Sequence, residues 1–244
     1  ILQGGMPYRD AWDHKQPLVY FVFAFGQLLT PGSLWGMWVI ELVLVTWAAW
    51  LGFRLLSRVI PPLLSFLAVA SGLLGLFSVI WVYSIEELAL PSQFLALEIF
   101  LLMLQESRFT RRLALSAGGG ALVGLSFLMK QNLVAAGAAA GAILFLRAIF
   151  GRERSHLAEL AGMTAGFLVP PGLAAAYLAS GGALRAYWDA AVAFNLSYTG
   201  LGPLERLNAL GESMEFISGV PILFLGLGLW GAGFMVVVMQ RGPA

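Results

Sequence analysis

The sequence has no cysteine, which excludes disulfide bonds and thiolate metal sites. It has two histidines, too few for a histidine-rich metal centre. Charged residues make up only 11% of the chain, less than half of the share of about 25% that soluble proteins carry. The net charge is +1, so the chain lacks the excess of basic residues that indicates a nucleic-acid partner.

Apolar residues take the place of the missing charges. They make up 59% of the chain, and the mean hydropathy is +0.84. A membrane-spanning helix needs about 20 consecutive apolar residues, so we predict an all-α, polytopic membrane bundle of about seven spanning helices. We place them at residues 34–55, 61–83, 94–104 with its flanks, 113–129, 133–150, 157–179 and 220–239. The third helix can begin near Leu88, with Pro91 in its first turn.

Residues 18–30 form a shorter apolar stretch that is followed by the breaker sequence TPGS. The stretch is too short to span a bilayer, and an interfacial or re-entrant helix fits it better. Its aromatic side chains, Tyr20, Phe21, Phe23 and Phe25, suit the headgroup boundary. We predict one domain over 1–244, with an outer loop and interfacial helix at 1–33, a bundle at 34–179, an outer loop at 180–219 and a last helix and tail at 220–244.

The basic residues set the predicted orientation. If the spans alternate, one side of the membrane receives nine arginines, namely Arg54, Arg58, Arg108, Arg111, Arg112, Arg147, Arg152, Arg154 and Arg241. The other side receives five basic residues, Arg9, Lys15, Lys130, Arg185 and Arg206. The positive-inside rule makes the arginine-rich side cytoplasmic in a plasma or inner membrane. The opposite, outer side receives eight acids, Asp10, Asp13, Glu86, Glu87, Asp189, Glu205, Glu212 and Glu215.

Four outer segments collect the polar chemistry, at residues 4–17, 84–93, 130–132 and 180–219. The first holds RDAWDHK directly before an apolar run. The last is about 40 residues long, which is long for a connection and indicates a functional or partly helical segment. We therefore expect any active site to face outward.

Three of these segments resemble one known family, in the same order along the chain. The segments GGMPYRDAWDHKQPLVYFVFAFGQLLTPGSLW, GLSFLMKQNLVAAG and VAFNLSYTG are similar to the first outer loop, a later Gly…Lys-Gln element and an outer-loop Asn…Tyr element of GT-C glycosyltransferases. The resemblance is to bacterial membrane enzymes that are similar to dolichyl-phosphate-mannose protein mannosyltransferases and to the lipid A aminoarabinose transferase. It extends over most of the chain.

The resemblance implies a polyprenyl- or dolichyl-phosphate sugar donor, a glycan, lipid or protein acceptor, and inverting transfer at the outer face. It implies an outer-loop acid as general base and cations on the carrier phosphate. The candidate catalytic acids are Asp10, Asp13, Glu86 and Glu87. The candidate substrate-binding residues are Arg9, Lys15, Lys130, Gln131, Asn195 and Tyr198. Lys15 precedes the predicted interfacial helix, where a lipid phosphate would lie.

The chain departs from the family pattern in two places. The family's principal catalytic aspartate follows its first spanning helix, upstream of the Gly-Gly pair. This chain begins at Ile1, so we expect a fragment that lacks that helix and that aspartate. The family often has an arginine near the position of Trp38. The sequence demands no cofactor. The carboxylates of Asp10, Asp13, Glu86 and Glu87 do offer the oxygen ligands that a divalent cation prefers.

Each candidate also has an ordinary structural role. Asp10 and Asp13 can solvate a loop and pair with Arg9 or Lys15, and a lysine at this depth can snorkel. Glu86 and Glu87 can be exposed charges at a helix end. The alternative is a polar contact in the loop for His14, an interfacial anchor for Lys130, and loop structure for Asn195 and Tyr198.

Features inside the apolar segments are best explained by helix packing. Glu41 and Glu98 can make polar contacts between helices, and the runs SAGGGALVG and AAGAAAGA indicate close packing through small residues.

Two other functions stay open. A transporter or flippase predicts inverted repeats and charges near the midplane, which the sequence does not display. A non-catalytic membrane subunit is the second.

Overall fold

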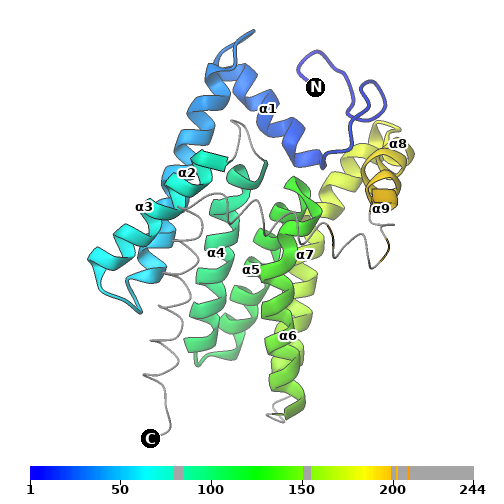
Figure 1. The fold of residues 1–244 in the computed structure, drawn as a ribbon. Helices are drawn as coiled ribbons and strands as arrows, with labels where there is room; N and C mark the ends of the chain where they lie inside the picture. Colours follow the sequence, from blue (N-terminus) through cyan, green and yellow to red (C-terminus); the bar gives the residue numbers. More distant parts are fainter. Residues whose placement is uncertain (80–84, 151–154, 199–201, 203–207, 209–244) are drawn as a thin grey trace, which may run out of the picture. The chain divides into compact units, whose positions relative to one another are not determined.

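The computed structural model describes residues 1–79, 85–150, 155–198, 202 and 208. Their regular structure is helical, which confirms the all-α prediction (Figure 1). Within these ranges, five helical stretches are long and apolar enough to cross a membrane. They are α2 (Trp35–Leu56), α4 (Ile85–Gln105), α5 (Phe109–Met129), the stretch Gln131–Phe150 and α7 (Ser155–Ser180). By length and composition, these helices support an integral membrane protein.

Shorter elements complete the described part. They are α1 (Pro17–Leu29), α3 (Pro62–Val79), the 3₁₀ turn η1 (Gln131–Val134), α6 (Ala135–Phe150), α8 (Leu184–Tyr187), the π-helix η2 (Trp188–Ala193) and α9 (Phe194–Tyr198). The predicted span at 61–83 is helical through Val79, and the one predicted at 220–239 lies outside the described residues. The loop predicted at 180–219 is indeed partly helical, since it contains α8, η2 and α9.

The chain forms two compact units. Unit 1 comprises residues 1–48 and 83–197, and unit 2 comprises residues 49–82 and 198–244. In unit 2, the Arg54 guanidinium lies 4.6 Å from the ring centroid of Trp50, and the Ser65 hydroxyl donates to the Pro61 carbonyl at 3.2 Å. Unit 1 contains every candidate site residue except Tyr198, so the site is built within it.

Helix α1 confirms the prediction of a short apolar helix at 18–30. Pro17 occupies its start, where the missing N–H costs no helical hydrogen bond. The helix ends in the TPGS turn, in which Gly32 takes a positive φ of 72°. Gln27 closes this turn, because its amide donates to the Ser33 carbonyl at 2.8 Å and its oxygen accepts from the Gly32 N–H at 3.0 Å.

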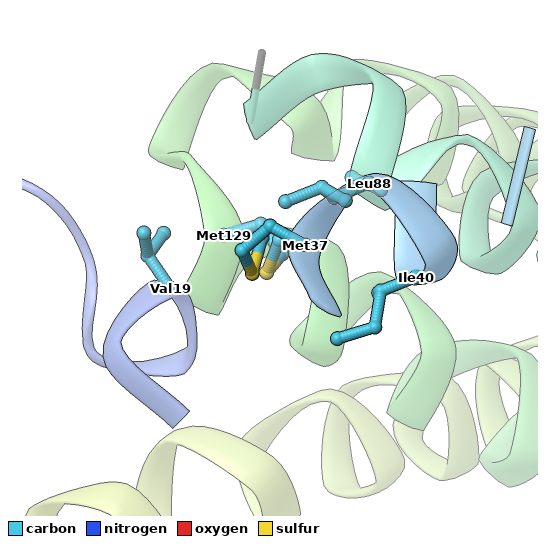
Figure 2. Close-up of a cluster of buried hydrophobic side chains, with 6 residues drawn as sticks. Val19, Met37, Ile40, Leu88 and Met129 are labelled. Atoms are coloured by element: carbon cyan, nitrogen blue, oxygen red, sulfur yellow. The ribbon is translucent and has the colours of Figure 1, made fainter. Parts of the chain in front are cut away.

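A buried apolar cluster holds α1 against the bundle (Figure 2). Val19 of α1 packs with Met37 and Ile40 of α2, Leu88 of α4 and Met129 of α5. The start of α4, the end of α5 and the first turns of α2 therefore meet α1 at one end of unit 1.

Helix α4 begins earlier than predicted. It starts at Ile85 rather than near Leu88, and Pro91 lies beyond its first turn. The acidic residues Glu86 and Glu87 occupy the first turn, where the partial positive charge of the helix N-terminus favours them. Glu86 and Glu87 are thus helical residues rather than loop residues.

Helices α5 and α7 pack at backbone distance, which confirms the predicted role of the small residues. A Cβ atom added to Gly120 would lie 2.8 Å from the carbonyl carbon of Met163. One added to Gly166 would lie 2.8 Å from the Cα atom of Ala117. These neighbours are backbone atoms of regular helices, so room for an added Cβ could be made only by moving the helices apart.

Gly166→Ala is therefore expected to destabilise the protein by about 1–3 kcal/mol, the usual cost of overpacking. Gly172→Ala in the same helix is the matched control, because its added Cβ meets no other part of the described chain within 4 Å. That control should be neutral or slightly stabilising, since alanine is the better helix former. Thermal unfolding in detergent measures both effects, and equal melting temperatures would contradict the close approach of α5 and α7.

Candidate functional site

The polar segments of unit 1 gather where α1 meets α4 and α5. We call this region the polar end; it comprises residues 1–16, 85–87, 130–131 and 181–197. Figure 1 shows the N-terminal loop beside α8 and α9. Arg9 donates to the Gly181 carbonyl at 2.9 Å, and the Asn195 amide donates to the His14 carbonyl at 2.9 Å. Lys130 pairs with Glu86, which ties the end of α5 to the start of α4.

The Ala191 carbonyl organises the polar end. It accepts hydrogen bonds from the side-chain amides of Gln16 at 3.3 Å, Gln131 at 2.7 Å and Asn195 at 2.8 Å. Ala191 lies in the π-helix η2. This conformation is rare in proteins overall, but where it does occur it is often at a functional site. Gln131 and Asn195, predicted to bind substrate, here join three separate segments of the chain. Their substrate role stays a prediction.

Asp10 stabilises the conformation of the N-terminal loop through hydrogen bonds with neighbouring residues. Its two oxygens accept from Nε and a terminal nitrogen of Arg9, each at 2.8 Å, and one also accepts from the Met6 N–H at 2.7 Å. The hydrogen bond from Arg9 and that from Met6 hold the pKa of Asp10 far below its ordinary value. Asp10 is consequently a poor proton acceptor, and Arg9 is engaged in the same contact.

Asp13 and Lys15 form a second pair, which is less exposed than the pair of Arg9 and Asp10. The Lys15 Nζ lies 3.2 Å from Oδ2 of Asp13, and their side chains are 42% and 27% exposed. Burial acts to raise the pKa of Asp13, but the hydrogen bond and charge of Lys15, with the N–H groups of His14 and Lys15, outweigh it and lower the pKa. Asp13 is thus ionised at neutral pH beside a cation that solvent can reach.

Three tyrosines pack beneath this pair. The ring centroid of Tyr8 lies 5.4 Å from that of Tyr20 and 5.1 Å from that of Tyr187. The Tyr8 hydroxyl donates to the Lys15 carbonyl at 2.6 Å, and the Tyr187 hydroxyl donates to Gln16 at 3.0 Å. Tyr8 has a φ of 68°, a strained conformation for a bulky residue that is concentrated at functional sites. We call these residues the tyrosine cluster.

The remaining acidic candidates lie at the start of α4. Glu86 is bound to Lys130, while Glu87 is 1% exposed, so the alternative of an exposed helix-end charge is wrong for Glu87. Glu41 and Glu98 are also buried, in α2 and α4. Tyr198 ends α9, but its side chain lies outside the described residues. Among the residues described, no three acidic or histidine side chains form a group that could hold a metal ion.

Sequence reasoning missed several members of the polar end. It assigned no role to Tyr8, Gln16 or Tyr187, nor to the ring contact of Trp12 with Phe194, whose centroids are 5.3 Å apart. The Tyr187–Gln16 bond joins residues 171 positions apart. The only local signal was the position of Tyr8 and Trp12 within the polar PYRDAWDHK stretch.

The chain is thus an all-α protein with five described helical stretches of membrane-spanning length and a polar end built from distant segments. Comparison with known proteins finds no matching family model, no similar curated protein and no similar solved structure.

Proposed function

We propose that this protein is a GT-C-type glycosyltransferase that moves a sugar from a polyprenyl- or dolichyl-phosphate donor to a glycan, lipid or protein acceptor outside the membrane. The observation that carries the proposal is the Lys15–Asp13 pair at the head of α1. The Lys15 ammonium could bind a phosphate, and the Asp13 carboxylate in contact with it could accept a proton. The residues that would hold the donor and accept the proton are therefore already adjacent.

The position of the pair directly before α1 supports a lipid substrate. Helix α1 contains no charged residue and leaves Phe21, Phe25 and Leu28 exposed on one face. Such a helix suits the boundary between headgroups and acyl chains. Lys15 precedes this helix by two residues, so its ammonium would lie at the level of a lipid phosphate, with the prenyl tail in the bilayer.

The proposed reaction is a single displacement. The acceptor hydroxyl oxygen attacks the anomeric carbon, and the bond from that carbon to the carrier phosphate oxygen breaks with inversion. The electron pair leaves on the phosphate, where Lys15 stabilises the added negative charge. Asp13 accepts the proton of the acceptor hydroxyl. Lys15 must turn from Asp13 toward the phosphate, which frees the carboxylate when the donor is bound.

Release of the carrier tests the proposal without knowledge of the acceptor. The full-length protein in liposomes is mixed with tritiated undecaprenyl-phosphate mannose, glucose or arabinose and a membrane extract as acceptor source. We expect free undecaprenyl phosphate and labelled acceptor to form together with at least one donor. An Asp13→Asn, Lys15→Met double variant is the inactive control, and parallel reactions with Mg²⁺ and with EDTA test the divalent cation.

Two outcomes would overturn the proposal. The first is folded wild-type protein that consumes none of the donors. The second is movement of an intact lipid-linked sugar across the bilayer without carrier release, which would support the flippase alternative.

A further inference from the structure

Two tryptophans of the polar end are exposed outside the helices of membrane-spanning length. Trp12, in the N-terminal loop, is 64% exposed, and Trp188, in η2, is 58% exposed. Lipid can cover the exposed tryptophans of α2, but these two rings lie outside any such helix. A single exposed apolar side chain is ordinary in proteins, so the neighbours of each ring decide whether it has a role.

Trp12 belongs to a cluster of three rings, Trp12, His14 and Phe194, which we call the ring platform. The Trp12 centroid lies 5.3 Å from that of Phe194, with the two rings at 89°, and the His14 centroid lies 6.3 Å from that of Trp12 and 5.7 Å from that of Phe194. The Asn195 amide donates to the His14 carbonyl at 2.9 Å, which attaches the loop to α9. Packing therefore holds the indole of Trp12 in place while most of its surface stays open.

The ring platform adjoins the Asp13 carboxylate. Oδ1 of Asp13 accepts from the His14 N–H at 2.7 Å and lies 3.4 Å from Nδ1 of the His14 ring. Oδ2 of the same carboxylate lies 3.2 Å from the Lys15 ammonium. A held aromatic surface, an imidazole that is 49% exposed and an ionised carboxylate thus occur at three consecutive residues, 12–14.

This combination matches the chemistry of a sugar ring. The C–H groups on one face of a pyranose carry partial positive charge, and they stack on the negative face of an aromatic ring. The hydroxyls around its edge form hydrogen bonds with carboxylate and imidazole groups. A lipid acceptor would need a continuous apolar surface, whereas the loop around Trp12 also exposes Arg9 and Asp10, with side chains 49% and 42% exposed.

We infer that the ring platform binds a carbohydrate acceptor, whose terminal sugar stacks on Trp12 and presents a hydroxyl to Asp13. This inference rests on the proposed glycosyltransferase function, and it narrows the acceptor from a glycan, lipid or protein to a glycan. The platform suits the acceptor rather than the donor, because it adjoins Asp13, the proposed base. The donor is held through its phosphate by Lys15.

Fluorine NMR tests sugar binding without the reaction. Full-length protein labelled with fluorotryptophan is placed in nanodiscs, and the signals of Trp12 and Trp188 are assigned by their loss in Trp12→Phe and Trp188→Phe. Methyl α-mannoside, methyl β-glucoside and chitobiose are then added at millimolar concentrations. We expect at least one of them to shift the Trp12 signal and none to shift the Trp188 signal.

Spin-labelled phosphatidylcholine in the same nanodiscs tests whether Trp12 is instead a membrane anchor. We expect it to broaden the Trp12 signal no more than the Trp188 signal. A Trp12 signal that is insensitive to every sugar, or that the spin-labelled lipid broadens selectively, would overturn the inference whether or not the protein is active.

Carrier release then tests the acceptor role. The membrane extract is separated into carbohydrate, protein and lipid fractions, and we expect the carbohydrate fraction to support release. Trp12→Leu, which keeps an apolar side chain but removes the ring, should raise KM for that fraction about tenfold and leave KM for the donor nearly unchanged. Trp12→Phe should retain most of the affinity, and Trp188→Leu is the matched control that should resemble wild type.

The outcomes separate this inference from the proposed function. Release that requires the protein or lipid fraction, or a rise in KM for the donor alone in Trp12→Leu, would overturn the carbohydrate acceptor and leave the glycosyltransferase function intact. Wild-type protein that binds a sugar at Trp12 but releases no carrier with any fraction would overturn the proposed function and leave the ring platform as a carbohydrate-binding site.

Discussion

Lys15→Met is expected to lower kcat/KM for carrier release about 100- to 1,000-fold, the usual loss when one preorganised group that stabilises a developing anion is removed. Methionine keeps the length and the apolar stem of the side chain, so the change isolates the charge. Lys15 is half exposed, and its ammonium pairs with Asp13, a neighbouring acid in the same loop, so the fold should persist. Carrier release over a range of donor concentrations measures the effect.

The pH dependence gives a second readout on the same variant. Lys15 lowers the pKa of Asp13, so the ionised base persists to lower pH when Lys15 is present. Without Lys15 the pKa of Asp13 rises, and the acidic limb of the rate profile should move to higher pH. If the limb stays in place, the base that controls the rate is not Asp13.

Arg185→Met is the matched control for the charge. Arg185 lies at the same polar end, its side chain is 95% exposed, and its Nε lies 4.0 Å from Oδ2 of Asp189. Loss of this arginine should change carrier release only slightly, by weakening the general attraction of anions. Equal losses in Lys15→Met and Arg185→Met would contradict a specific phosphate contact at Lys15.

Glu159→Leu is expected to destabilise the protein by about 3 kcal/mol, because it leaves the partly buried Arg112 guanidinium, 22% exposed, without its partner. Glu159 is 1% exposed within α7, and its two oxygens lie 3.0 Å from Nε of Arg112 in α5 and 2.8 Å from Nδ1 of His156. The Arg112–Glu159 contact is an ion pair, and its atoms are not aligned as a hydrogen bond. Denaturant titration in detergent measures the loss.

The double variant Arg112→Met, Glu159→Leu makes the test sharper. Replacing both charges with apolar side chains removes the uncompensated charge, so the double variant should recover most of the stability that either single variant loses. Arg111→Met is the matched single control, since Arg111 is 69% exposed in its pair with Glu106 and exposed pairs contribute little. Additive losses in the double variant would mean that the two charges do not depend on each other.

The candidate site could be predicted only in part from the sequence. Asp13 and Lys15 were recognisable because they adjoin the short apolar helix and contact each other two residues apart. Asp10 was chosen on the same grounds, yet its oxygens are occupied by Arg9 and the Met6 N–H. Sequence spacing gives no account of which carboxylate oxygens are already engaged by hydrogen bonds.

Hydropathy and length alone determined that the chain is helical, that it has helices of spanning length, and that a shorter apolar helix follows the polar loop. These properties are local, because each helix satisfies its own backbone hydrogen bonds. The thickness of the bilayer sets the length that an apolar run needs to cross it. The tertiary structure alone decided that Gln16, Gln131 and Asn195 meet at the Ala191 carbonyl and that the rings of Tyr20 and Tyr187 pack against Tyr8. Such contacts join residues far apart in the chain, and they depend on how the helices pack rather than on any local pattern.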